Sequence, residues 1–490
     1  MLAGFAQFLH ASGRWERLCE SAPFAYASNN APEVNDILGT LVLGILSGAN
    51  RFAHLSALRH DTLAMELFGM TKVASEDSVR RAIKSLDPAK ADAWLVGELS
   101  ESVRPFIGAA PWILDVDVTV KLLYGRAQEG AAVSYNPAKP GRPSRVHHAF
   151  LMAGTRLALD LDVRAGDEHA SRHGLDRLCS YLETTAREWR PLIVRGDCGY
   201  GNEEWMRRMD ALSQPYLFKI RLSKNARKLA RSEPAPGEPG WEKDESGWEC
   251  RETMLKCDTW EKPRRVVVQR RLRSETQLAA AKKKRLAAKG APKRDEPLLE
   301  LAGYTELLVE NEDALKYEYA VLASNTGLKP AETCRLYRDR GDAENPFDEL
   351  KNQWGWDGFS VRELAASAAA ARLVAIVYNW WSLYTRLVLP GKHRESITSR
   401  PRLLGGVARK TEHAGQRHLA VKLTHAACAT TKAGVVAAFV FLASLVAGKD
   451  APQLDATARW ARVGGRIAEQ ILAERAARDT AGPPPPAKPT

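Results

Sequence analysis

Four residues whose side chains suit phosphate and metal chemistry stand at helical spacing near residue 340. Tyr337, Arg340, Glu344 and Lys351 follow one another at intervals of three, four and seven residues. On one helix their side chains would fall within roughly 60° of one another. A carboxylate on such a face can bind a hard divalent cation, while a phenol and two cations can bind phosphodiester oxygens. The competing interpretation is an exposed helix held by ordinary charge pairs.

Pro346 bears on this arrangement because it lies just after the carboxylate. Proline has no amide hydrogen and disfavours helical geometry in the residue before it, here Asn345. The sequence therefore predicts a kink just after Glu344, which would move Lys351 off the common face. Asp348, close to the same face, is the alternative carboxylate.

The spacing Tyr-x2-Arg-x3-Glu-x6-Lys resembles the signature of DDE transposases of bacterial insertion sequences, in the cut-and-paste group called the insertion-sequence-four superfamily. The resemblance covers residues 111–385. In that family the Glu is the third catalytic carboxylate, and two Asp lie upstream on strands. Asp117 in PWILDVDVTVKLLYG and Asp197 in PLIVRGDCGYG fit those positions. Asp115 shares a strand face with Asp117, and the Asp-x-Thr match selects Asp117.

The resemblance also implies a reaction and its cofactor. The three carboxylates, Asp117, Asp197 and Glu344, would bind two Mg²⁺ ions, with Mn²⁺ able to substitute. Tyr337, Arg340 and Lys351 would contact DNA. Water would cut one strand at the end of the element, and the freed 3′-hydroxyl would attack the opposite strand before joining target DNA. The implied partners are double-stranded DNA, as terminal inverted repeats and as target, and a second copy of the chain in the DNA complex.

Hydrophobic periodicity predicts an α/β fold with an RNase H-like core in the order β-β-β-α-β-α-β. This order implies that the first and fourth strands are parallel neighbours, which would bring Asp117 and Asp197 together. The predicted domains are a helical DNA-binding region (1–110), the first part of the core (111–222), a β-rich basic insertion domain (223–322), the second part of the core (323–390), a helical region (391–480) and a disordered tail (481–490).

One helix of the N-terminal region has a clear start signal. Ser75 followed by Glu76 and Asp77 predicts an N-cap with acids in the first turn. The helix that follows could present Arg80, Arg81 and Lys84 to DNA as part of a helix-turn-helix, although an ordinary surface helix fits these residues equally well. The resemblance favours binding of the terminal repeats here.

The charge of the chain is concentrated in one segment. From Lys262 to Arg294 there are 13 Lys and Arg and one acid, Glu275, so this segment alone accounts for the net charge of +12. It is predicted to follow DNA phosphates rather than to be a solvated loop. The seven Cys are scattered without a CxxC pair, which predicts reduced thiols.

Two observations bear on location, and two other functions compete with transposition. No secretion signal is recognised, and the longest apolar run, residues 433–448, is short for a bilayer span. The expected location is the bacterial cytoplasm, on the nucleoid, without membrane insertion.

The alternative functions are an RNase H-like nuclease without strand transfer and a DNA-binding regulator with a decayed core. The signature counts against the first and the intact acidic residues against the second.

Overall fold

The computed structural model separates into two compact units. Of the described residues, 2–178, 184–191 and 341–446 belong to the first unit, and 179–183 and 192–340 to the second. The predicted tail, 481–490, and the polybasic run 282–294 lie outside the described residues. The structure describes residues 2–446 except 26–29, 108–110, 125–126, 135–138, 169, 235, 238, 281–315, 390–392 and 426.

The first unit begins with helices, as the apolar periodicity of residues 1–110 predicts. Ser75 caps one of them, because its Oγ accepts a hydrogen bond from the Ser78 amide at 3.1 Å. Glu76 and Asp77 occupy the first turn of that helix, where the macrodipole favours acids. The elements are α1 (Leu2–Ala11), α2 (Arg14–Glu20), α3 (Val34–Leu46), the 3₁₀ helix η1 (Phe52–His60), α4 (Thr62–Leu67), α5 (Glu76–Ser85) and α6 (Pro88–Ile107).

Antiparallel strands follow in the same unit. β1 (Ile113–Leu122) pairs with β3 (Pro143–Met152), which pairs on its other side with β4 (Leu157–Ala165). The two-residue strand β2 (Ala132–Val133) pairs with the start of β3. Apart from this short strand, the element order is the predicted one. It continues with α7 (Ala170–Thr184), β5 (Ile193–Gly201), α8 (Glu203–Ala211) and β6 (Tyr216–Ile220).

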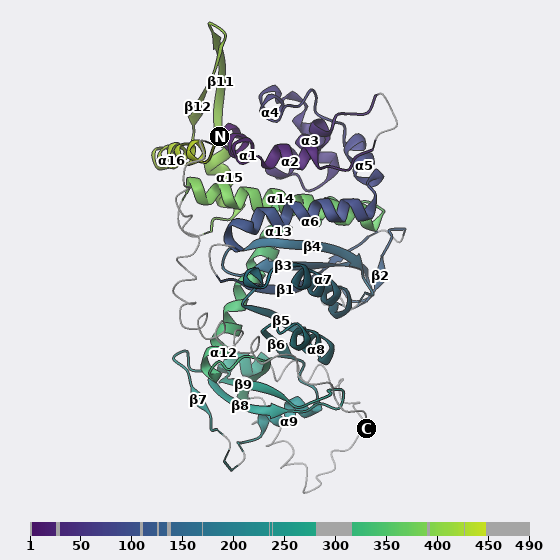
Figure 1. The fold of residues 1–490 in the computed structure, drawn as a ribbon, viewed down its shortest axis with the longest axis vertical. Helices are drawn as coiled ribbons and strands as arrows, with labels where there is room; N and C mark the ends of the chain where they lie inside the picture. Colours follow the sequence, from purple (N-terminus) through teal and green to yellow (C-terminus); the bar gives the residue numbers. More distant parts are fainter. Residues whose placement is uncertain are drawn as a thin grey trace. The chain divides into compact units, whose positions relative to one another are not determined.

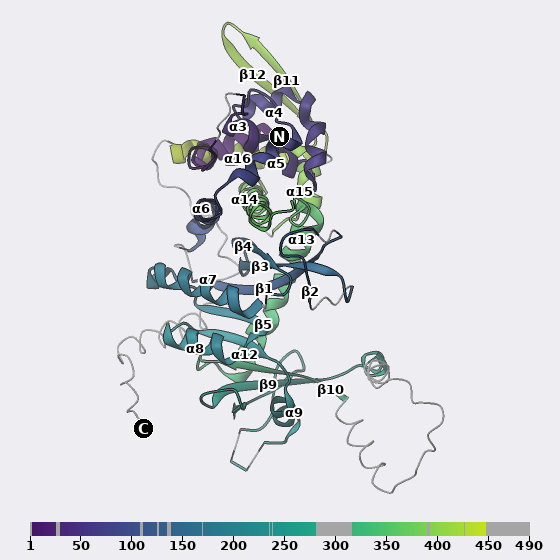
Figure 2. The same ribbon diagram turned by 90° about the vertical axis from the view of Figure 1, so that its right-hand side faces the viewer.

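The long Ala-rich helix α14 (Leu364–Val388) is buried almost throughout. It lies beside α6 along β4 (Figures 1 and 2). The fully buried Asn379 accepts a hydrogen bond from the Ala158 amide at 2.9 Å and donates to the Ala158 carbonyl at 2.7 Å, so the helix is bonded directly to the strand backbone. Trp380 and Trp381 are buried too, so these aromatics of the helix are packing residues.

The C-terminal part of the first unit is not wholly helical, contrary to the expectation for residues 391–480. After α15 (Ser396–Leu404) come β11 (Gly406–His413) and β12 (Gln416–Leu423), a two-stranded hairpin that extends away from the helices (Figures 1 and 2). The apolar run that begins at residue 433 falls in α16 (Cys428–Val446), in which Val436 and Val440 are exposed by 53% and 66%. No described helix combines the length and apolar character needed to span a bilayer.

The second unit is built on one sheet in the order β5, β6, β10, β9, β8, β7. Its first two strands are parallel and the other pairs are antiparallel. The predicted insertion, residues 223–322, therefore contributes strands that continue the sheet of β5. The boundaries of the insertion as a domain stay a prediction. The remaining elements are α9 (Lys224–Arg231), β7 (Glu242–Lys243), β8 (Glu249–Leu255), β9 (Arg264–Leu272), β10 (Tyr317–Ser324) and α12 (Pro330–Arg338).

Part of the basic segment 262–294 has a structural role in this sheet. The guanidinium of Arg264 is buried and lies 2.8 Å from both Glu203 and Asp210 of α8. Arg270 pairs with Glu249 on the neighbouring strand at 2.6 Å. These arginines of β9 therefore bind carboxylates of α8 and β8, and the phosphate contacts of the segment stay a prediction. Their carboxylate partners lie 21 to 61 residues away in sequence. None of the seven Cys, all of which are described residues, forms a disulfide bond, as predicted.

Candidate active site

Asp117 lies at the point where β1 emerges from the core. Residues 113–116 of the strand are buried, whereas residues 117–122 are partly exposed. Asp115 is only 2% exposed, while Asp117 is partly accessible and its Oδ1 accepts a hydrogen bond from the Val118 amide at 2.8 Å. The two carboxylates share a strand face, and it is Asp117 that a substrate can reach. Accessibility thus supports the choice that the Asp-x-Thr match made.

Glu344 is the first residue of α13 (Glu344–Trp354) and is exposed. The chain runs from α12 through the 3₁₀ helix η3 (Asp339–Ala343) into α13, so the helical geometry changes before Glu344. The predicted break after Glu344 is wrong. Pro346 falls in the first turn of the new helix, where an amide hydrogen has no intrahelical partner and proline is tolerated. Asp348, the alternative carboxylate, is also exposed.

Lys351 reaches the strand that carries Asp117. Its Nζ donates a hydrogen bond to Thr119 Oγ1, two residues beyond Asp117 on β1. Partial burial lowers the pKa of the Lys351 ammonium from its usual value, and the nearby carboxylates of Asp357, Asp348 and Asp117 oppose this shift. One cation of the signature therefore lies beside the first predicted carboxylate, within the first unit.

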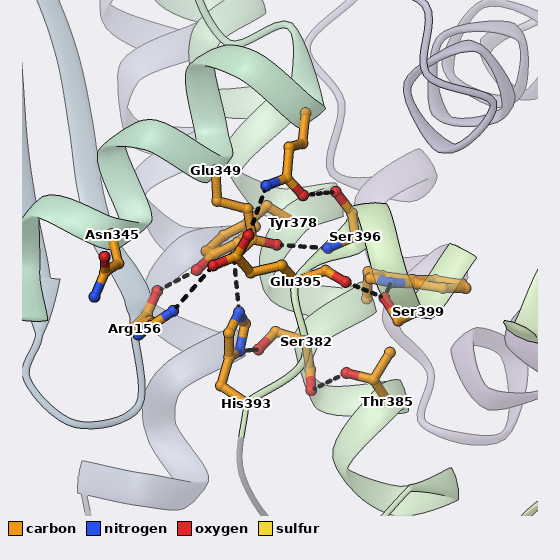
Figure 3. Close-up of polar contacts among 12 residues, drawn as sticks. Arg156, Asn345, Glu349, Tyr378, Ser382, Thr385, His393, Glu395, Ser396 and Ser399 are labelled. Atoms are coloured by element: carbon orange, nitrogen blue, oxygen red, sulfur yellow. Dashed lines mark hydrogen bonds and ion pairs between the residues drawn. The ribbon is translucent and has the colours of Figure 1, made fainter. Parts of the chain in front are cut away.

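A buried carboxylate one turn further along α13 fixes the helix in place (Figure 3). Glu349 is 2% exposed, lies 2.7 Å from His393 Nε2, and accepts hydrogen bonds from the Ser396 amide at 3.0 Å and the Trp354 indole at 3.2 Å. Glu349 thereby ties the helix that begins with Glu344 to the start of α15. Sequence reasoning did not assign Glu349 this role; the available signal was its position among the apolar residues Pro346, Phe347 and Leu350.

A second set of contacts, distinct from those of Glu349, holds the segment preceding Glu344. Asp342 pairs with Arg156, at the turn between β3 and β4, with a distance of 2.7 Å (Figure 3 shows Arg156). The Arg156 carbonyl accepts a hydrogen bond from the Tyr378 hydroxyl at 2.7 Å, which connects this turn to α14. Asn345 donates to Asp342 at 2.9 Å. The Asp342–Arg156 pair therefore anchors the segment just before α13, the Asn345–Asp342 bond spans the start of the helix, and Glu344 between them is exposed.

Asp197 lies in the second unit, in an irregular part of β5. Gly196 pairs with Phe218, but the next paired residue is Gly201, opposite Ile220, so residues 197–200 bulge out of the ladder. The Asp197 carboxylate is partly accessible and accepts a hydrogen bond from the Gly199 amide at 2.8 Å. A Cβ at Gly201 would lie 2.0 Å from the Lys219 carbonyl oxygen, so only glycine permits this approach of β5 to β6.

The other two signature residues also belong to the second unit. Arg195, next but one before Asp197, donates to the Leu336 carbonyl at 2.6 Å, so the strand of Asp197 and the helix that carries Tyr337 are bonded to each other. Tyr337 is partly exposed. Arg340 is only 8% exposed, which conflicts with its expected place on an open helix face. A helical pattern alone could not reveal this burial, since it depends on neighbours distant in sequence.

The predicted metal ligands are described only within their own units. Asp117 and Glu344 belong to the first unit and Asp197 to the second. Among the described residues, no group of three or more His, Cys, Asp and Glu side chains is gathered closely enough to hold a metal ion. The donor chemistry nonetheless fits a hard cation, because all three carboxylates are accessible and carboxylate oxygens are the ligands that Mg²⁺ prefers. The three-carboxylate site stays a prediction.

Comparison with known proteins places the chain in a family. No curated protein matches it significantly. Among solved structures, the cryo-EM structure of the piggyBac transposase synaptic complex with hairpin DNA is similar, at 12% sequence identity and a TM-score of 0.37, over 81% of this chain and 77% of that chain. A family model for the transposase DDE domain matches residues 108–380. Because this match spans more than half of the 490 residues and includes Asp117, Asp197 and Glu344, the chain belongs to the family of DDE-domain transposases.

Proposed function

We propose that the chain is a cut-and-paste transposase of a bacterial insertion sequence, in the group with the Tyr-x2-Arg-x3-Glu-x6-Lys signature. It binds the ends of the element and catalyses metal-dependent strand cleavage and strand transfer into target DNA. The observation that carries the proposal is the family match together with the contact between Lys351 and Thr119, beside Asp117. The contact supports the proposal because the Lys351 ammonium bonds to Thr119, two residues from the partly exposed Asp117.

In the proposed mechanism, Asp117, Asp197 and Glu344 act as ligands, and no covalent enzyme intermediate forms. When bound, two Mg²⁺ or Mn²⁺ ions supply stabilisation of the attacking and departing oxygens. Lys351 donates hydrogen bonds to a non-bridging oxygen of the reacting phosphodiester, and Thr119 orients its ammonium. Water attacks the phosphorus and the 3′-oxygen departs. The resulting 3′-hydroxyl is the nucleophile of strand transfer.

The proposed partners follow from this activity. They are double-stranded DNA, both as terminal inverted repeats and as target, and a second copy of the chain in the DNA complex. The proposed location is the bacterial cytoplasm, on the nucleoid. Tyr337 is proposed to contact the DNA as well, since it is partly exposed on α12. Arg340 is proposed to contact the DNA too, but because it is buried, a structural role in η3 fits it equally well.

The proposed function is tested with a linear duplex that carries one end of the element, taken from the inverted repeats flanking the gene. With Mg²⁺ we expect nicking at the end, then hairpin formation, and then joining to a second DNA. Removing the metal with EDTA should stop all three steps and restoring Mn²⁺ should recover them. Nicking without hairpins or joined products would instead favour the nuclease, and end binding without any cleavage would favour the decayed regulator.

Lys351 gives a prediction that separates catalysis from folding. Lys351→Met keeps the aliphatic stem and removes the charge, so single-turnover cleavage should fall roughly tenfold to a thousandfold. Because burial already disfavours the ammonium in the folded protein, the melting temperature should not fall. For the same reason, cleavage by the wild type should decline with rising pH before it reaches the usual lysine pKa. A variant that melts earlier and cleaves normally would make Lys351 a structural residue.

A further inference from the structure

The first unit contains a cavity of about 890 Å³ next to the candidate active site, lined by residues 120–124 and by Lys351 among others. It is lined by the end of β1, by η1 and α5 of the N-terminal helices, and by residues 357–363. Lys351 belongs to its wall, so one side chain both contacts Thr119 and faces the cavity. The cavity therefore continues from the strand that carries Asp117.

The lining is strongly basic. It includes six Lys and Arg but only two acids, Asp357 and Glu363. Both acids are already paired, since Glu363 lies 2.8 Å from Lys84 and Asp357 lies 3.6 Å from Lys121. The Lys84 pair is about 40% exposed on each side, and pairs of this kind contribute about 1 kcal/mol or less. A polyanion could therefore replace Glu363 as the partner of Lys84 at small cost.

Of the exposed basic side chains at the cavity, two are not paired with an acid in the described part of the chain. Arg51 precedes η1, and Arg362 precedes α14. Within the part of the chain that the structure describes, neither guanidinium makes a hydrogen bond or an ion pair. Arg80, by contrast, is occupied by Asp77 of its own helix at 3.1 Å. Arg51 and Arg362 are thus the cations most able to bind an incoming phosphate.

An exposed aromatic ring completes the lining. Tyr124, two residues after β1, is 72% exposed, and the cations of Arg142 and Lys139 lie 5.3 Å and 5.8 Å from its ring centroid. An exposed aromatic ring among cations is the combination that binds nucleic-acid strands, because bases stack on the ring and phosphates meet the charges. A small anion would use the charges but not the ring.

We propose that this cavity binds the DNA strand that continues from the reacting phosphodiester. Arg51 and Arg362 contact its phosphates and Tyr124 stacks on one of its bases. The proposal rests on the proposed function, because it takes β1 and Lys351 as the place of strand cleavage. It goes further by assigning DNA contacts to Arg51, to Tyr124 and to residues 357–363, and by giving the strand a direction away from Asp117 along β1.

The test is DNA binding by the full chain in EDTA, measured between 50 and 200 mM salt, values in the range where phosphate contacts change affinity strongly. The probe is a duplex with a single-stranded extension. The double variant Arg51→Gln/Arg362→Gln should reduce the slope of log affinity against log salt by about 0.7 to 0.9 for each lost phosphate contact. Tyr124→Ala should weaken binding about fivefold or more, and Tyr124→Trp should restore it.

The matched control is Lys422→Gln/Lys432→Gln, which removes two exposed cations that neither line the cavity nor belong to the predicted DNA-binding region 1–110. It should keep the wild-type slope. An unchanged slope in the cavity variant, or an equal fall in the control, would overturn the proposal. Because binding is measured without metal, a wild type that binds but never cleaves would defeat the proposed function and leave this result standing.

Discussion

Replacing Asp117 or Asp197 with Asn, or Glu344 with Gln, is expected to reduce single-turnover cleavage of an end-containing duplex by roughly a hundredfold to a thousandfold or more. Each change keeps the shape of the side chain and removes one negative charge. Binding of the same duplex should stay within a few-fold of wild type, because affinity for DNA comes mainly from phosphate contacts made elsewhere. Cleavage and binding are measured on the same protein preparations.

The controls for this prediction are the two neighbouring acids. Asp115→Asn tests the buried carboxylate on the same strand face, and Asp348→Asn tests the exposed one a turn beyond Glu344. Neither should reduce cleavage to the same degree. If Asp115→Asn lost cleavage while Asp117→Asn kept it, the first ligand would be the buried residue. If Asp348→Asn lost cleavage while Glu344→Gln kept it, the third ligand would be Asp348, and the family spacing would not hold here.

Glu349→Ala is expected to destabilise the first unit by about 3–5 kcal/mol. The change removes a fully buried carboxylate that accepts hydrogen bonds from the Ser396 amide and the Trp354 indole and pairs with His393. Those groups would be left buried without their partner, which is the costly situation for polar groups. Urea unfolding followed by circular dichroism measures the loss.

The comparison variant is Glu344→Ala, on the same helix and five residues earlier. Because Glu344 is exposed, its removal should change stability by no more than about 0.5 kcal/mol while cleavage is lost. Glu349→Gln should recover part of the stability, since an amide oxygen can still accept hydrogen bonds. Equal stability of the Glu349→Ala and Glu344→Ala proteins would show that the buried network does not hold α13.

The sequence by itself determined the elements and their order. Alternation of apolar residues identified β1 and placed Asp117 on it, and the glycines after Asp197 indicated the irregular end of β5. The Ser75 cap and the continuous apolar surface of α14 were also readable, because capping and burial on all sides leave local patterns of residue type. The spacing around Glu344 identified the family before any contact was known.

Only the tertiary structure decided which charged residues are buried in contacts of the fold and which are exposed. Glu344 and Glu349 are both helical glutamates, yet one is exposed and the other is buried against residues about 45 positions later in the chain. Arg264 and Arg270 counted as basic charge in the sequence, yet carboxylates of α8 and β8 neutralise them. Lys351 reaches Thr119 across 232 residues. Helix and strand periodicity records neighbours a few residues apart, so pairings over such separations are fixed only when the chain packs.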